Sequence, residues 1–300
     1  MNSLELFKTP KFYQIDISIL QDLGYDVLLS NRIFDSLLFW KYDILFSYFY
    51  RYSFFAALLA KCFGKKTYFT GGIDSLDSDY ASAFNYKIQA LFFKLCYWVA
   101  DSCIIVSQSD LKNIFKVSSL KKKLSYSEHV INTKLFIADV PKEKIFTSIV
   151  WMGDEGNVVR KGVDKALQIF AELKKIPEFV DYRFVIIGRK GEGEVLVRSI
   201  IDKYNLKGSV ELKGEVSEED KINLLKQSKY YFQLSLYEGF GLAALEALCA
   251  NNIIIHSGKG GLANPIYKEQ LLFDIDNDFD SELLKLVNKL ACFTPITSYD

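Results

Sequence analysis

The sequence is poor in the residues that build disulfide frameworks and histidine metal sites. It holds five cysteines without a CxxC pair, and most of them lie in apolar runs such as Lys94-Leu95-Cys96-Tyr97-Trp98. Such cysteines are typical of reduced core residues in a cytoplasmic protein. Only two histidines are present, His129 and His256, which argues against a histidine-based zinc site. We therefore expect no metal centre.

Long apolar runs and an excess of one charge are also missing. The apolar run at residues 54–60 is far shorter than the roughly 20 residues that span a bilayer, and the start of the chain does not resemble a signal peptide. Lys and Arg together number 37, as do Asp and Glu, which argues against a nucleic-acid partner. Residues 1–146 carry 18 basic and 14 acidic side chains, a net charge of +4. This bias suits an anionic surface, although ordinary scatter explains it equally well.

Short apolar runs alternate with segments of helical length and spacing along the whole chain. In the first half, runs typical of buried strands stand at Tyr25–Leu29, Asp43–Phe46, Thr67–Phe69 and Cys103–Val106. The same alternation continues in the second half. It predicts parallel sheets with helices on both faces. A polar stretch with a proline at residues 137–147 predicts two domains, at residues 1–146 and 147–300.

The stretch EGFGLAALE, residues 238–246, places two carboxylates eight positions apart. Glu238 follows a predicted strand, and Glu246 lies on a predicted helix that is apolar on almost every side. Such a helix is buried. A carboxylate on it can accept two hydrogen bonds from a vicinal diol such as a ribose. The alternative is that Glu246 lies on an exposed stripe of the helix.

Three further segments lie next to predicted helices or strands. Arg160-Lys161-Gly162 opens a helix, and Gly214-Glu215-Val216 follows the strand at residues 210–212. Gly188-Arg189 begins a loop with glycines in GxxGxG order, which is a weak phosphate-binding signal and fits a plain strand-to-helix loop.

Taken together, these segments resemble the retaining glycosyltransferases of family 4, which have the GT-B fold. Glu238 and Glu246 match the EX7E signature of that family. Arg160-Lys161-Gly162 looks like its basic diphosphate-binding element, and Gly214-Glu215-Val216 looks like its segment near the base. The order and spacing match over residues 148–262.

The resemblance implies an α/β protein with two Rossmann-like, doubly wound parallel-sheet domains that face a cleft, the N-terminal one reduced. It implies that Glu238 contacts the donor sugar and that Glu246 holds the ribose. Arg160 and Lys161 would neutralise the leaving diphosphate, which makes these two residues and Glu238 the catalytic candidates. The remaining donor-binding candidates are Gly239, Phe240, Gly241, Leu242, Gly188, Arg189 and Val216. No cofactor is implied, because the nucleotide-sugar is a substrate.

The sequence departs from the family pattern at two places. Asp154 stands where relatives usually carry an arginine for phosphate. The N-terminal half resembles the family less, and Gly71-Gly72-Ile73-Asp74 stands where many relatives have a histidine. We take Gly71, Gly72 and Asp74 as acceptor-side candidates, although Asp74 also fits a simple turn.

The expected function is a retaining, metal-independent hexosyltransferase that moves a sugar from a nucleotide-sugar to a glycan or lipid-linked acceptor. The family's mechanism implies same-face attack, with the leaving phosphate taking the acceptor's proton. The aromatic run at residues 39–55 and Lys121-Lys122-Lys123 favour docking of a cytoplasmic protein at the inner membrane face, although a buried strand explains the run as well. Two other classes stay open, which are a GT-B sugar-nucleotide epimerase and a non-catalytic nucleotide-sugar-binding subunit.

Overall fold

A computed structural model describes residues 11–71, 73–137 and 140–292 of the chain. It divides the chain into two compact units, Met1–Ile131 and Asn132–Asp300. The domain boundary expected between residues 146 and 147 falls inside the strand β5 (Glu143–Ile149), which belongs to the second unit. The sequence hides the start of this strand because its first two residues, Glu143 and Lys144, are charged and exposed. The expected linker at residues 137–147 also includes residues 138 and 139, which lie outside the described residues.

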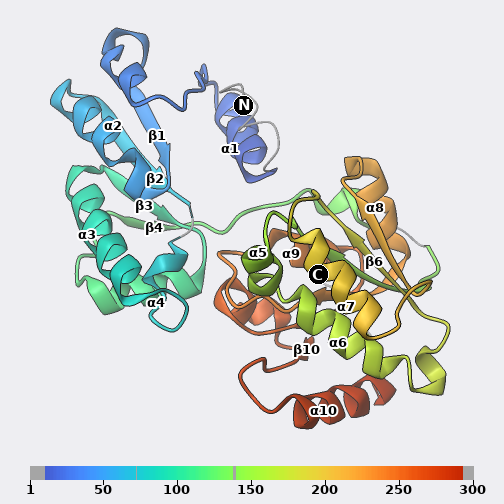
Figure 1. Cartoon of the computed structure of the whole chain (residues 1–300). Helices are drawn as coiled ribbons and strands as arrows, with labels where there is room; N and C mark the ends of the chain where they lie inside the picture. The colour runs from blue at the N-terminus through green and yellow to red at the C-terminus, as the bar shows by residue number, and fades with distance from the viewer. Residues whose placement is uncertain (1–10, 72, 138–139, 293–300) are drawn as a thin grey trace. The chain divides into compact units, whose positions relative to one another are not determined.

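The first unit contains a four-stranded parallel sheet in the order β1-β2-β3-β4. Its strands are β1 (Ile44–Tyr48), β2 (Lys66–Thr70), β3 (Ser102–Ile105) and β4 (Leu124–Tyr126). The connecting helices are α2 (Tyr50–Cys62), α3 (Ala83–Val99) and α4 (Gln108–Val117). Because consecutive strands are neighbours and such crossovers are right-handed, all three helices cover one face of the sheet (Figure 1).

The opposite face of this sheet carries α1 (Lys11–Asp22) (Figure 1). The ring of Tyr13 meets the ring of Tyr48 edge-on, with 4.5 Å between centroids. The Tyr48 hydroxyl also donates to Asp16 Oδ2 at 2.8 Å. The first unit is therefore a four-stranded parallel sheet with helices on both faces.

The strand expected at Tyr25–Leu29 is wrong. Residues 25–30 belong to no strand, and the side chain of Leu28 is 64% exposed. A short apolar run forms a strand only where a neighbouring strand can pair with it and a core can bury it. The sequence pattern alone does not show whether these two partners are present. The strands expected at residues 43–46, 67–69 and 103–106 are confirmed to within two residues as β1, β2 and β3.

The second unit contains a six-stranded parallel sheet in the order β10-β9-β8-β5-β6-β7. Beyond β5, its strands are β6 (Arg183–Ile187), β7 (Val210–Gly214), β8 (Ser228–Gln233), β9 (Ile253–His256) and β10 (Leu271–Leu272). The chain runs outward from β5 through β6 to β7, then returns to β8 on the other side of β5. The strand order therefore reverses between β5 and β8. Ligands of doubly wound sheets bind at such a switch point, beyond the carboxyl ends of the strands.

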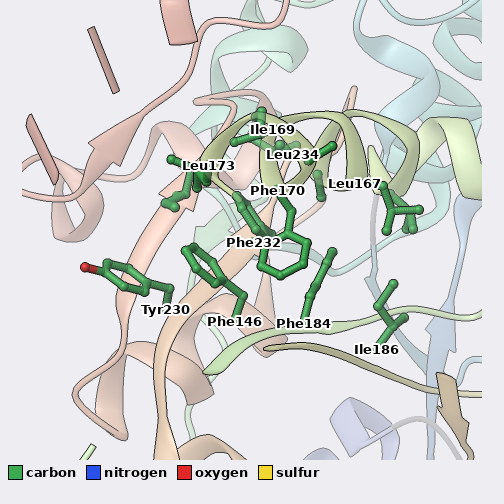
Figure 2. Close-up of a cluster of buried hydrophobic side chains, with 14 of the residues drawn as sticks. Phe146, Leu167, Ile169, Phe170, Leu173, Phe184, Ile186, Tyr230, Phe232 and Leu234 are labelled. Atoms are coloured by element: carbon green, nitrogen blue, oxygen red, sulfur yellow. The ribbon is translucent and has the colours of Figure 1, made fainter. Parts of the chain in front are cut away.

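The core of the second unit lies between this sheet and the helix α6 (Val163–Leu173), as Figure 2 shows. Phe146 of β5 stacks against Phe232 of β8 at 5.1 Å and packs edge-on against Phe170 of α6 at 5.5 Å. Each large apolar side chain that is fully buried stabilises the fold by about 1.5–3 kcal/mol. The two strands that flank the switch point are thus fixed by one aromatic cluster.

Among the described helices, none is both long and apolar enough to cross a bilayer.

Candidate functional site

The loop after β5 leads into a short helix, α5 (Glu155–Arg160), whose first residue follows Asp154. The Asp154 carboxylate accepts a hydrogen bond from the Asn157 backbone N–H at 2.7 Å and so caps the helix. The Asn157 side-chain oxygen in turn accepts from Arg160 Nη2 at 2.7 Å. Asp154, which departs from the family pattern, therefore has a structural role here, and it orients the turn that carries Arg160.

Gly162 brings the end of α5 against the end of β8. Its φ of 68° is left-handed, and a Cβ at this position would lie 2.0 Å from the carbonyl oxygen of Leu234. The Arg160 carbonyl also accepts from the Leu236 backbone N–H at 2.8 Å. Only glycine permits this approach without strain. As a consequence, the neighbouring residue Lys161 reaches the loop that follows β8.

Glu238 receives three side-chain donors on one oxygen. Its Oε1 lies 2.5 Å from Lys161 Nζ, 2.7 Å from Ser235 Oγ and 2.8 Å from Gln233 Nε2. Tyr231, which is fully buried, donates to Gln233 Oε1 at 3.1 Å and extends the network into the core. Glu238 itself is only 9% exposed. These contacts fix the direction of the carboxylate at the switch point.

The loop between Glu238 and the helix α9 (Leu242–Cys249) packs against two glycines, Gly260 and Gly261, in the loop that follows β9. A Cβ on Gly260 would lie 2.1 Å from the Glu238 carbonyl oxygen, and the Gly261 N–H donates to that oxygen at 2.6 Å. Gly241, with a φ of 89°, turns the chain into α9. Backbone N–H groups at the start of a helix attract phosphate and hydroxyl oxygens. Three further donor-binding candidates line this turn, namely Gly239, Phe240 and Leu242, and all three are half-buried.

Glu246 lies in the middle of α9 and is 3% exposed, so its predicted burial is confirmed. Its Oε2 accepts from Lys221 Nζ at 2.7 Å. Lys221 belongs to the adjacent helix α8 (Glu218–Gln227), and the same ammonium contacts Glu218 Oε1 at 3.0 Å. This lysine was not among the predicted site residues, because a lysine among acidic residues on a helix is usually solvated.

The remaining donor-side candidates lie at the carboxyl ends of β6 and β7, on the same edge of the sheet as Glu238. Gly188 has a φ of 132°, and a Cβ there would lie 2.0 Å from the Val150 carbonyl oxygen. Arg189 is exposed, and Val216 packs partly buried against the cluster that contains Ile187 and Leu224. The parallel sheet thus brings these residues to one edge of the second unit.

His256 ends β9, just before the loop that carries Gly258, Gly260 and Gly261. Burial lowers the pKa of its imidazole to about 4, so the side chain is neutral at pH 7. Its Nδ1 accepts from the Gly258 backbone N–H at 3.2 Å. This residue therefore shapes the loop and adds no charge to the site.

The acceptor-side candidates lie in the first unit, where β2 ends. Gly71 is buried with a φ of 105°, and a Cβ there would lie 3.3 Å from the Phe49 backbone nitrogen. Asp74 is exposed and accepts from the Ser75 N–H at 2.9 Å, as a turn residue does. Gly72 lies outside the described residues. Within the described part of the chain, no group of three or more His, Cys, Asp or Glu could hold a metal ion.

Two parallel-sheet α/β units are the architecture of the GT-B class of folds. The crystal structure of Anabaena HepE in complex with UDP-glucose matches 91% of this chain and 79% of its own, with a TM-score of 0.71 and 12% identity. The expected fold class is therefore confirmed. At this identity the likeness concerns the fold alone.

Sequence comparison finds similarity to glycosyltransferases. Residues 156–290 match the sequence model of the family Glycosyl transferases group 1, a match that lies within the second unit. The chain is 32% identical over 163 residues to GDP-mannose:cellobiosyl-diphosphopolyprenol alpha-mannosyltransferase of Xanthomonas oryzae pv. oryzae, covering 47% of this chain and 40% of that protein. It is 27% identical over 129 residues to the phosphatidylinositol N-acetylglucosaminyltransferase GPI3 subunit of Saccharomyces cerevisiae, covering 43% of this chain and 28% of that protein. The chain thus spans less than half the length of these two relatives.

Proposed function

We propose that the protein is a retaining glycosyltransferase of family 4 that takes a hexose from a nucleotide-sugar donor. The observation that carries this proposal is the ion pair of Lys161 with Glu238 at the switch point, 2.5 Å from Nζ to Oε1. A cation and a carboxylate held together at the switch point fit the roles that the resemblance gives them, at the leaving diphosphate and the donor sugar. The group 1 domain at residues 156–290 supports it.

In the proposed reaction, the bond between the anomeric carbon and the diphosphate breaks, and a bond from that carbon to an acceptor oxygen forms on the same face. The acceptor's proton goes to the leaving diphosphate. Negative charge grows on the leaving group, so the Lys161 ammonium stabilises the transition state more than the ground state. Glu238 orients both Lys161 and the sugar hydroxyls. The reaction proceeds without a metal, since a fixed cation takes that role.

The acceptor is a glycan or a lipid-linked glycan, in the biosynthesis of a polysaccharide or glycoconjugate. The names of both sequence relatives support a lipid-linked acceptor, because one contains a diphosphopolyprenol and the other phosphatidylinositol. The acceptor binds in the first unit, where Gly71 and Asp74 follow β2.

Membrane contact is made by the outer faces of α2 and α3 in the first unit. Large side chains that are more than half exposed project from both helices, at Tyr52, Phe55, Phe84, Leu91 and Trp98. The last three recur every seven residues and so share one face of α3. The two helices contain Arg51, Lys61, Lys87 and Lys94 and neither Asp nor Glu. Such a basic and apolar surface suits the anionic leaflet on the cytoplasmic side of a membrane.

One lysine of the run at residues 121–123 and part of the aromatic run have other roles. Lys123 Nζ donates to the carbonyl oxygens of Tyr97 and Trp98 and so ends α3. Tyr50 and Phe54 are buried in the core of the first unit. The proposed membrane surface therefore rests on α2 and α3 and not on Lys123.

A panel of GDP, UDP and ADP sugars tests the proposed activity. We expect one donor to raise the melting temperature and to transfer its sugar to a polyprenyl-diphosphate glycan, with the anomeric configuration kept. Epimer formation from the donor alone would identify an epimerase. Binding without transfer or hydrolysis across acceptors would identify a non-catalytic binding protein, and no binding at all would overturn the proposal.

A further inference from the structure

The two carboxylates of the EGFGLAALE segment are each held by a lysine from a different element. Glu238 pairs with Lys161 after α5, and Glu246 pairs with Lys221 of α8. Lys221 is itself well covered, since its side chain is 14% exposed. The second pair is more deeply buried than the first, because the Glu246 side chain is 4% exposed and that of Glu238 is 11% exposed.

A buried carboxylate needs a partner to stay charged at modest cost. Lys221 supplies that partner, and its short contact at 2.7 Å fixes the direction of Oε2. Glu218 Oε1 holds the same ammonium from the exposed side at 3.0 Å. The ammonium is thereby clamped between two helix residues, and the orientation of Glu246 depends on it.

The position of Lys221 places it at the nucleoside end of the site. Helix α8 starts directly after Val216, with Ser217 as its N-cap. The resemblance assigns Gly214–Val216 to the neighbourhood of the base. Lys161, in contrast, meets Glu238 at the diphosphate end.

The geometry points to Lys221 as a positioning residue for ribose recognition, an inference that rests on the proposed function. It orients Glu246 so that the carboxylate accepts hydrogen bonds from the ribose hydroxyls of a nucleoside diphosphate. Lys221 acts through Glu246 and touches no reacting atom. Its removal therefore affects nucleotide affinity, and only for nucleotides that carry the hydroxyls.

The test compares GDP and UDP with their 2′,3′-dideoxy forms by calorimetry, on the full chain. Lys221→Met should weaken binding of the ribose form about tenfold and leave the dideoxy form unchanged, since a hydrogen bond to a charged group is lost. Lys221→Arg should keep the affinity of the parent. Glu218→Gln is the matched control, because it removes the exposed contact of the same ammonium, and it should change neither affinity by more than about twofold.

A second measurement separates positioning from simple destabilisation. Lys221→Met takes the lysine partner away from a buried carboxylate, whereas the double variant with Glu246→Gln removes the charge as well. If Lys221 acts through Glu246, adding Lys221→Met to Glu246→Gln should cause no further loss of affinity. Equal weakening of ribose and dideoxy forms, additive losses in the double variant, or tighter binding in Lys221→Met would each overturn the inference while leaving the proposed function intact. A parent protein that binds none of these nucleotides would overturn both.

Discussion

Lys161 Nζ lies 2.5 Å from Glu238 Oε1, although the two residues are 77 positions apart in the sequence. The contact exists because β5 and β8 are neighbours in the sheet and because Gly162 lets the two following loops touch. The pair is only partly exposed, at 22% for the lysine side chain and 11% for the glutamate. A cation so placed is already desolvated and oriented before a ligand arrives, as electrostatic stabilisation of a transition state requires.

Lys161→Ala should lower turnover about a hundredfold and weaken binding of the nucleoside diphosphate much less, because charge on the leaving group grows in the transition state. Steady-state kinetics and calorimetry check this. Arg160→Ala should lose less turnover, since the Arg160 side chain donates to Asn157, on its own helix. Lys175→Ala is the control, as this exposed lysine pairs with Glu172, three positions away. Unchanged turnover in Lys161→Ala would remove Lys161 from the mechanism.

Gly162→Ala should lower the free energy of unfolding by at least about 2 kcal/mol, because the new Cβ meets a backbone carbonyl at a left-handed position. Gly208→Ala is a matched control, since Gly208 also has a positive φ, of 84°, but open space around its Cβ. It should cost about 1 kcal/mol from the backbone conformation alone. Urea unfolding measures both, and equal losses would show that the approach to Leu234 does not constrain the loop.

Much of this site could be predicted from the sequence because the signals are local. Buried strands of a parallel sheet are continuous apolar runs, as at Phe184–Ile187, and the helix around Glu246 is apolar on almost every side. Glycines where two backbone segments approach closely can also be recognised in the sequence, since Gly162 and Gly188 stand directly beside the helix or strand that they connect. The alternation of strands with helices and the burial of Glu246 followed from these patterns.

The partners across elements could not be predicted in this way. Lys221 and Glu246 are 25 positions apart on different helices, and only the packing of α8 beside α9 brings them together. Gln233 is a polar residue at the end of an apolar strand, which could have marked it as a partner for a buried charge. The cap at Asp154 had a local signal, since an Asp directly before the first residue of a helix is typical of an N-cap.

The half-buried Lys142 should make the free energy of unfolding depend on pH. Its ammonium donates to the carbonyl oxygens of Leu225 at 3.2 Å and Ala250 at 2.5 Å, and burial lowers its pKa to about 8. The unfolded chain keeps this lysine protonated up to about pH 10.4. The unfolded state therefore binds more protons between about pH 8 and 10, so this residue adds stability as the pH rises through that window. Below about pH 8 the cost of burying the ammonium is fully present.

The comparison with Lys142→Met isolates this effect. The free energy of unfolding of the parent minus that of the variant should be flat below about pH 7 and should rise from about pH 8 to 10. Lys144→Met is the control, because that lysine pairs with Asp181 on the surface and both side chains are more than half exposed. A difference that stays flat up to about pH 10 would show that Lys142 is not desolvated.

The proposed membrane surface on α2 and α3 predicts salt-dependent and reversible binding to vesicles. Each basic residue near an anionic leaflet contributes about 1 kcal/mol, and this attraction is screened beyond a Debye length of about 8 Å at physiological salt. The parent should co-sediment with vesicles of phosphatidylglycerol and phosphatidylcholine at low salt, and much less at about 1 M salt or with phosphatidylcholine alone. A second copy of the chain is a poorer occupant of this surface, because it would place the lysines of α2 and α3 against one another.

Variants of α3 separate the apolar and the electrostatic parts. Phe84→Ser with Trp98→Ser should reduce binding about tenfold or more at every salt concentration, because two exposed aromatic side chains no longer enter the interface. Lys87→Gln with Lys94→Gln should reduce binding at low salt only. Val195→Ser is the control, since its side chain is 69% exposed on α7 (Glu194–Lys203) of the second unit. Equal, negligible binding of the parent to anionic and neutral vesicles would leave the outer face of α2 and α3 without a lipid partner, and a soluble glycan would then be the better acceptor to test.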